Sequence, residues 1–198
     1  MNVVFDLGMV LIDWDPRHLY RKVFEDEAEM EWFLTHVCHP EWNLEQDGGR
    51  SFDDGVTEAI TRHPKHAAEI AMYRDRWMEM VPGAIMGSVD ILESLHKNGT
   101  PLYAITNWNQ DTFRATRGRF PFLNLFRDIV VSGDEKMLKP VPEIFHLLAT
   151  RNNISLSHSI FIDDSMKNVK GAEAVGMQAH HFITSEGLRA DLKNRNIL

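Results

Sequence analysis

Five short apolar runs alternate along the chain with segments in which apolar residues recur at helical spacing. The runs are typical of strands buried on both faces, and they cover Asn2–Phe5, Leu102–Thr106, Ile129–Ser132, Ser159–Ile162 and Gln178–Phe182. Helical spacing between the runs predicts helices at Ser88–Asn98, Pro142–Asn152 and Ser165–Val175, the last capped by Ser165. Strands that alternate with helices in this way predict an α/β fold with a parallel sheet.

Residues 16–82 interrupt the alternation, because this stretch contains no convincing strand. Asp15 precedes Pro16 in the arrangement of a helix cap followed by proline at the first helical position, and Ser51 begins a variant of the capping box. Apolar residues at helical spacing follow in Ala67–Met80. We therefore predict an all-helical module at residues 16–82, inserted into a core of residues 1–15 and 83–198, with hinges near residues 8–14 and 82–83.

Composition and charge narrow the class of protein. The chain has 198 residues, enough for one sizeable core with a smaller appended unit. Its formal net charge of −8 argues against binding to nucleic acid or to anionic membranes. A single cysteine excludes an internal disulfide, and the sequence shows neither a signal-peptide pattern nor an apolar run long enough to span a membrane. We expect a cytoplasmic protein that is a monomer or a homodimer.

Chemically active side chains stand at the ends of three predicted strands, and a lysine stands just before a proline. They are Asp6, Thr106, Asn107, Asp163, Asp164 and Lys139. Because strand ends of an open parallel sheet meet in one crevice, we expect these groups to share a pocket. Carboxylates bind hard cations such as magnesium, and a carboxylate can attack phosphorus once negative charge is offset. The set predicts a site for a divalent cation and a phosphate, with Asp6 as nucleophile.

The order of these residues resembles the four motifs of the haloacid dehalogenase superfamily, whose largest branch is phosphatases. The matching segments are Phe5–Leu11, Ile105–Asn107, Lys139-Pro140 with Pro142 and Phe145, and Phe161–Asp164 with Asn168 and Gly171-Ala172. The resemblance spans the whole chain, and the combination is specific although each piece alone is weak. It implies a Rossmann-like core with a helical cap inserted after the first strand, in agreement with the predicted elements.

The resemblance also implies roles for the motif residues. The ligands of a magnesium ion would be Asp6, the main-chain oxygen of Gly8, Asp164, and Asp163 either directly or through water. The phosphoryl group would be held by Thr106, Asn107 and Lys139. The implied activity is that of a magnesium-dependent phosphomonoester hydrolase, which acts on a small phosphorylated metabolite through an aspartyl-phosphate intermediate.

Gly8 departs from the family pattern, because phosphatases of this family usually carry a second aspartate at that position. That aspartate protonates the leaving group and then activates water, and such groups typically contribute about 10²–10⁴-fold. Asp13 or Asp15 is a candidate to replace it, a substrate with a good leaving group is a second explanation, and a different reaction is a third. The resemblance includes a subgroup with glycine here, close to sugar-phosphate phosphatases, which makes a sugar phosphate a candidate substrate.

Two other functions are compatible with the sequence. A 2-haloacid dehalogenase of the same superfamily would use Asp6 to attack carbon without a metal, although that branch typically lacks consecutive acids such as Asp163 and Asp164. A catalytically silent protein that binds phosphorylated ligands would retain the pocket and lack the acid at Gly8.

Four further residues are candidates for contact with the substrate. Trp14 and Trp108 adjoin the first and second motifs, where they would either line the substrate entrance or pack between cap and core. Trp42 and Arg50 stand between predicted cap helices, in a position where capped members of the family have a loop that faces the active site. Asp15 has an alternative role as a helix cap.

Overall fold

A five-stranded parallel sheet forms the centre of the protein, of which the computed structural model describes all 198 residues. The strands lie in the order β5-β4-β1-β6-β7, and every neighbouring pair is parallel. Their bounds are β1 Asn2–Phe5, β4 Leu102–Thr106, β5 Asp128–Val131, β6 Ser159–Asp163 and β7 Gln178–His181. The parallel α/β fold predicted from the alternation of strands and helices is confirmed.

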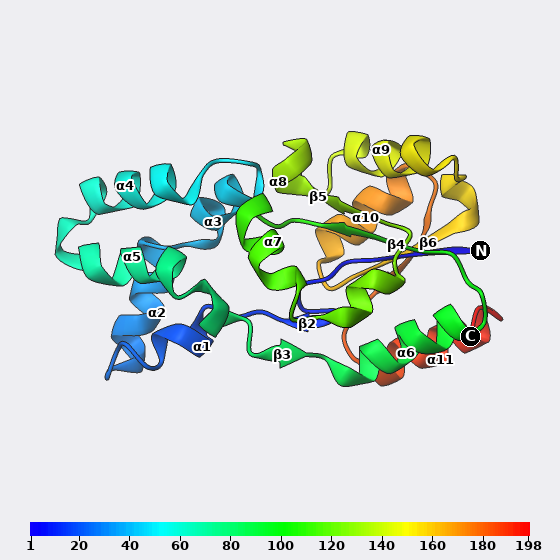
Figure 1. Cartoon of the computed structure of the whole chain (residues 1–198), viewed down its shortest axis with the longest axis horizontal. Coiled ribbons are helices and arrows are strands. Elements are labelled where there is room, and N and C mark those ends of the chain that lie inside the picture. The colour runs from blue at the N-terminus through cyan, green and yellow to red at the C-terminus, as the bar shows by residue number, and fades with distance from the viewer.

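Helices cover both faces of this sheet, which explains why the central strands β1, β4 and β6 are buried over almost their whole length. The edge strand β7, predicted as an apolar run buried on both faces, has the sequence Gln-Ala-His-His and is only partly buried. Val4 and Phe161 pack on one face, and Val3 and Phe5 on the other. Figure 1 shows α9 and α10 above the sheet and α6 and α11 below it. The helices of this part are α6 Met86–Lys97, α7 Gln110–Arg117, α8 Ser132–Glu135, α9 Pro142–Asn152, α10 Met166–Ala174, α11 Ser185–Asn194 and the 3₁₀ turns η3 Pro121–Leu125 and η4 Leu156–His158.

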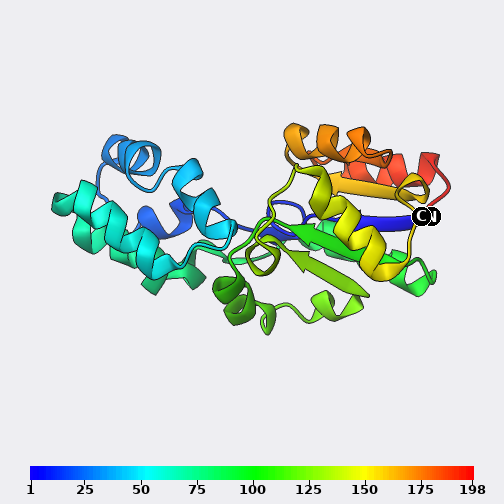
Figure 2. The same ribbon diagram turned by 90° about the horizontal axis from the view of Figure 1, so that it is seen from above.

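A lobe made only of helices lies beside the sheet (Figures 1 and 2). Its elements are α1 Arg17–Tyr20, α2 Glu27–His36, α3 Pro40–Asp47, α4 Phe52–Arg62, η1 Pro64–His66, α5 Ala67–Asp75 and η2 Trp77–Met80. Aromatic rings fill its interior, with the ring centroids of Tyr20 and Phe33 5.0 Å apart and those of Trp42 and Tyr73 5.1 Å apart. The division of the chain into domains at residues 15/16 and 82/83 stays a prediction.

A short ribbon joins the two parts of the molecule. The strand β2, Ile12–Asp13, pairs antiparallel with β3, Gly83–Ala84, so the chain leaves and re-enters the core at the same place. Each strand has two residues, too few to produce a recognisable pattern in the sequence, and neither was predicted. No helix of the chain is both long and apolar enough to cross a membrane.

Helix ends follow the sequence signals at some positions and depart from them at others. The Ser51 hydroxyl accepts a hydrogen bond from the Asp54 amide at 3.1 Å, as the capping box predicted. Ser165 does not cap α10 with its side chain. Its amide donates to the Asp163 carboxylate at 2.8 Å instead, because that carboxylate lies at the end of β6 beside the helix start.

Close packing of α10 against the segment after Lys139 yields a stability prediction. A methyl group at Gly171 would lie 2.5 Å from Cβ of Pro140, whereas one at Gly118 would meet nothing within 4 Å. Gly171→Ala should therefore lower the free energy of unfolding by about 1–3 kcal/mol, the usual cost of overpacking. Gly118→Ala, the matched control, should change it by less than about 0.5 kcal/mol. Urea denaturation measures both, and equal stabilities would contradict the packing described.

Candidate active site

A buried lysine ties together two carboxylates at the carboxyl end of the sheet. Nζ of Lys139 lies 2.8 Å from Oδ1 of Asp6 and 2.7 Å from Oδ2 of Asp163. The three residues come from the end of β1, the loop before α9 and the end of β6, and all are buried. Burial opposes the charge of Lys139, but the attraction of Asp6 and Asp163 outweighs it and raises the pKa of the ammonium group. Lys139 therefore carries a fixed positive charge in this site.

The carboxylate of Asp163 is saturated with donors. Its Oδ1 accepts from the Ser165 amide at 2.8 Å and from the side-chain amide of Asn168 at 3.0 Å. Its Oδ2 accepts from Lys139 at 2.7 Å and from the same Asn168 amide at 3.1 Å. With these contacts and full burial, Asp163 orients Lys139 and has little lone-pair capacity left for a direct bond to a metal ion.

The Asp6 carboxylate presents its two oxygens differently. Oδ1 accepts from the Leu7 amide at 2.7 Å and from Lys139 at 2.8 Å. Because both donors meet the same oxygen, Oδ2 is the atom available to a cation or to phosphorus. Burial raises the pKa of Asp6 against the attraction of Lys139, and the neighbouring Asp163 raises it further. A bound cation would favour the ionised form that a nucleophile needs.

The second motif holds the lysine segment in place through its amide side chain. The Lys139 amide donates to Oδ1 of Asn107 at 2.8 Å, and Nδ2 of Asn107 donates to the Lys139 carbonyl at 3.2 Å. Thr106 is buried at the end of β4, next to β1 in the sheet. The Lys139–Pro140 peptide bond that follows is cis. The three strand-end segments and the loop that carries Lys139 therefore reach one edge of the sheet.

The acids at this edge fit a divalent cation. One carboxylate oxygen from each of Asp6, Asp163 and Asp164 lies within 4.8 Å of the other two, and Asp164 is exposed at the rim. Three carboxylates against one ammonium group leave an excess of negative charge, and oxygen ligands are the ones that magnesium prefers. Gly8 lies in the tight turn after β1, where the Met9 amide donates to the Ile12 carbonyl at 2.8 Å.

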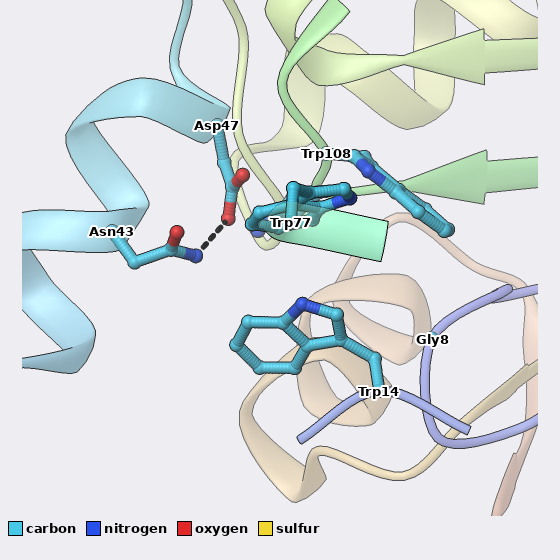
Figure 3. Close-up of a pocket in the computed structure, with 7 residues that line it drawn as sticks. Gly8, Trp14, Asn43, Asp47, Trp77 and Trp108 are labelled. Atoms are coloured by element: carbon cyan, nitrogen blue, oxygen red, sulfur yellow. Dashed lines mark hydrogen bonds between the residues drawn. The ribbon is translucent and has the colours of Figure 1, made fainter. Parts of the chain in front are cut away.

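A cavity of about 70 Å³ lies between the helical lobe and this edge of the sheet. Figure 3 shows the indole rings of Trp14, Trp77 and Trp108, the side chains of Asn43 and Asp47, and Gly8 around it. Asn107 is the seventh lining residue. Trp14 and Trp108 line this cavity at the junction of lobe and core. Their contact with the substrate stays a prediction.

A larger cavity of about 400 Å³ adjoins the first and shares Trp14 and Asn43 with it. Its other lining residues are Met9, Asp15, Pro16, Arg17, Leu34, Thr35, Cys38, Pro40 and Tyr73. The guanidinium group of Arg17 is occupied by Glu31, 2.6 Å away, and by Asp15, 3.3 Å away. The walls of this cavity are therefore mainly apolar, with space for an organic group attached to whatever binds beside Asp6.

Asp47 is a buried acid on the wall of the smaller cavity. Its Oδ2 accepts from Nδ2 of Asn43 at 2.9 Å and its Oδ1 from the Asn109 amide at 3.1 Å. Burial raises the pKa of Asp47 to about 8, the Asn109 amide and Lys139 lower it, and the charge of Asp6 raises it. Asp47 therefore holds its proton at neutral pH.

The end of α3 is also a contact between the lobe and the core. Nδ2 of Asn109 donates to the carbonyls of Gln46 and Arg50 at 3.1 and 3.2 Å. The Ser132 hydroxyl donates to the Asp47 carbonyl at 2.6 Å. These bonds hold the carboxyl end of α3 above the strand ends, and so they set the position of Asp47.

Four of the residues singled out from the sequence lie away from the smaller cavity. Trp42 lies inside the lobe, packed on Tyr73, and donates from Nε1 to the Gly55 carbonyl at 3.2 Å, because its segment is the helix α3 and not the expected loop. Arg50 pairs with Glu45, 2.6 Å away, and with Glu58. The prediction that Trp42 and Arg50 contact the substrate is therefore corrected, because neither residue lines the smaller cavity.

The two acids proposed to replace the one missing at Gly8 are likewise engaged elsewhere. Asp13 contacts Nε2 of His18 at 3.1 Å, and Asp15 accepts from the Arg17 amide at 2.8 Å. Asp15 therefore acts as the helix cap that was its alternative interpretation, and it borders only the larger cavity. Neither acid lines the cavity beside Gly8.

Sequence reasoning missed Asp47, Asn43 and Trp77. They lie far along the chain from the motifs, and a single acid near the end of a helix resembles any surface acid in sequence. The segment Gln46–Arg50, with its two glycines, was the available signal, since a helix that ends there can approach another part of the chain closely. Gly49 indeed has φ 103° and lies near Gly133.

Comparisons with known proteins found related sequences and similar folds. The sesquiterpene phosphatase astK of Aspergillus oryzae is 28% identical over 183 residues, which is 92% of this chain and 89% of that protein. A wild-type haloacid dehalogenase family enzyme from Bacteroides thetaiotaomicron, solved with magnesium and inorganic phosphate, has a TM-score of 0.67 at 23% identity and covers 90% of this chain and 92% of its own.

The fold by itself does not decide the reaction. A dehalogenase structure also has a TM-score of 0.67, at 18% identity, over 90% of this chain and 82% of its own. At the level of the family the result is clear, because the profile of the haloacid dehalogenase-like hydrolases matches residues 3–181. This chain therefore belongs to the haloacid dehalogenase-like hydrolase family.

Proposed function

We propose that the protein is a magnesium-dependent phosphomonoester hydrolase that works through a phosphorylated Asp6. The observation that supports this most is the buried contact of Lys139 with Asp6 and Asp163, next to a third acid at the same sheet edge. Such a site combines a positioned carboxylate with an excess of negative charge, and this is the environment for a divalent cation and a phosphate dianion. The phosphatase relative and the structure solved with magnesium and phosphate support the same proposal.

Each residue of the site has a separate role in the proposed reaction. Oδ2 of Asp6 attacks phosphorus, while Lys139 and Leu7 hold Oδ1 and so fix the direction of attack. Three donors would face the oxygens of the transferring group: the ammonium group of Lys139, the hydroxyl of Thr106 and the backbone amide of Asn107. Asp163 keeps Lys139 charged and oriented. Water then attacks the phosphorylated Asp6 and releases inorganic phosphate.

Magnesium would be held by Asp6, Asp164 and the main-chain oxygen of Gly8, with Asp163 linked through water. When bound, this ion offsets the repulsion between the carboxylate nucleophile and the phosphate and places their oxygens together. The indirect role for Asp163 follows from its saturated hydrogen bonds.

The charge of the site favours a phosphate over a 2-haloacid. A dehalogenase needs no metal, and its substrate carboxylate would meet three carboxylates offset by a single ammonium group. A phosphate brought in with a cation avoids that repulsion. The dehalogenase alternative is therefore weaker, although the fold admits both.

The cavities indicate a substrate whose organic part has apolar faces. Three indole rings border the small cavity, and the 400 Å³ cavity that shares Trp14 and Asn43 with it has mainly apolar walls. The relative named as a sesquiterpene phosphatase points in the same direction. We propose a phosphate monoester of an apolar alcohol as the preferred substrate, while the sugar phosphate suggested by the sequence stays an alternative.

Removal of the nucleophile or of the metal should abolish phosphate release. With para-nitrophenyl phosphate as substrate, Asp6→Asn should reduce activity to the level of the buffer, because the amide cannot form the acyl phosphate. A chelator should do the same to the unmodified enzyme, and added magnesium should restore turnover. Asp13→Asn, the same change outside the cavity, is the control and should retain activity. Turnover by the Asp6→Asn variant would rule out the covalent route.

A panel of substrates separates the classes of reaction and substrate. We expect kcat/KM for farnesyl monophosphate to exceed that for glucose 6-phosphate by at least about tenfold, since apolar contacts with a C–H-rich group add free energy of binding. Phosphate release measures both. A preference for the sugar ester would overturn the apolar substrate class and leave the phosphatase proposal standing. Halide release from a 2-haloacid in chelator, without phosphate release from any ester, would identify a dehalogenase. Tight phosphate binding with no turnover would identify a binding protein.

A further inference from the structure

One ionisable side chain lines the cavity beside Gly8. The seven lining residues are three tryptophans, two asparagines, Gly8 and Asp47. Asp6, Asp163 and Asp164 are not among these residues, and Asp13 and Asp15 are engaged by His18 and Arg17. Asp47 is therefore the one ionisable side chain that lines this cavity together with Gly8.

We propose that Asp47 is the general acid and base that the first motif lacks, supplied by the helical lobe instead of by the strand end. The inference rests on the proposed phosphatase function and adds one catalytic residue to it.

The proposed proton transfers balance over one turnover. As Oδ2 of Asp6 bonds to phosphorus, the bond from phosphorus to the leaving oxygen breaks, and that oxygen takes the proton of Asp47. Asp47 is then a carboxylate. It takes a proton from the water that attacks the phosphorylated Asp6, the bond between phosphorus and Asp6 breaks, and inorganic phosphate leaves with Asp47 neutral again.

Neighbouring side chains orient the Asp47 carboxyl group. The hydroxyl of Tyr73 donates to Oδ1 of Asn43 at 3.1 Å, which fixes the amide so that Nδ2 donates to Oδ2 of Asp47. The Asn109 amide holds the other oxygen. Asn43 borders both cavities, so Asp47 lies where the phosphoryl end of a substrate would meet its organic part. Figure 3 shows the Asp47 carboxyl group beside Asn43 on the wall of the smaller cavity. The leaving oxygen would lie at this junction.

The protonation state of Asp47 suits this role. Its carboxyl group is buried, and its pKa is raised to about 8 against the opposing effects of the Asn109 amide and Lys139. The charged groups that act on it are thus Asp6 from β1 and Lys139 from the loop before α9. An acid of this kind carries its proton at pH 7 and can give it up to a developing alkoxide.

Unpaired donors in the same cavity point to a ligand with oxygen atoms. Nε1 of Trp14 and Nε1 of Trp77 are buried and have no hydrogen-bond partner, although buried indole N–H groups usually find one. Both rings line the cavity with Asp47. An ester whose oxygens reach this cavity would satisfy those donors and lie against the acid.

Because there is space beside Gly8, an experiment can test whether an acid at this position replaces Asp47. A Cβ atom built on Gly8 would meet nothing within 4 Å, so an aspartate can be placed there without a clash. Asp47 also takes part in contacts of the lobe with Asn109 and Ser132, and loss of those contacts alone could lower activity. The experiment must therefore separate proton transfer from docking of the lobe.

The dependence of activity on the leaving group separates proton transfer from docking of the lobe. With Asp47→Asn, kcat/KM for an alkyl phosphate should fall by about 10²–10⁴-fold, because its alkoxide needs a proton. The value for para-nitrophenyl phosphate, whose leaving group needs none, should fall by less than about tenfold. Gly8→Asp added to Asp47→Asn should restore part of the activity towards the alkyl ester. Asp13→Asn should change neither value.

Other results would overturn the inference. Equal losses on the two esters would make Asp47 a docking residue, and unchanged activity on the alkyl ester would remove it from the reaction. Phosphate release from para-nitrophenyl phosphate that depends on Asp6 shows that the proposed function survives such a result. Absence of phosphate release from both esters in the unmodified enzyme would overturn both proposals.

A second measurement uses the unmodified enzyme, and it therefore remains informative if the Asp47→Asn variant fails to fold. Its kcat/KM for the alkyl ester should decline as the pH rises through the pKa of Asp47, because the acid is then lost. The value for para-nitrophenyl phosphate should not show that decline. Parallel pH profiles for the two esters would contradict the role of Asp47, since changes at Asp6 or Lys139 affect both substrates alike.

Discussion

The contact of Lys139 with Asp6 and Asp163 is the interaction on which the site depends. Three charged groups are costly to bury, and they are tolerated because Lys139 pairs with both carboxylates and further donors meet Asp6 and Asp163. Loss of one member from such a group typically costs about 3–5 kcal/mol, because it leaves an uncompensated buried charge. The same contact joins three segments that meet at one edge of the sheet. The fold and the proposed chemistry therefore both require this contact.

The position of the helical lobe is the second constraint on the proposed hydrolysis. Asn109 and Ser132 bind the carboxyl end of α3, and this brings Asp47 onto the core. A general acid carried by the lobe would work only while the lobe is docked, whereas one at Gly8 would be present at all times. Proton transfer and exclusion of water would then be linked in a single closed arrangement.

Gly8 acquires a different meaning in this setting. In the sequence it is a missing acid, and a missing acid argues for a silent protein or for an unusual reaction. In the structure it lines a cavity together with Asp47, a buried acid whose pKa is raised to about 8. The departure from the family pattern is thus compatible with full phosphatase chemistry, with the acid moved from one part of the chain to another.

The sequence determined the strands, the helices around them and the six polar residues at the sheet edge, because apolar periodicity and strand ends are local features. Folding then brings Asp6 and Asp163 together without further information, since β1 and β6 are neighbours in the sheet. Asp47, Asn43 and Trp77 could not be found this way. Their role depends on how α3 and η2 dock on the core, and docking is set by contacts such as Asn109 with Asp47 that leave no periodic trace in the sequence. Trp42 shows the same limit, because only the packing of the lobe decided that its ring faces Tyr73 and not the cavity.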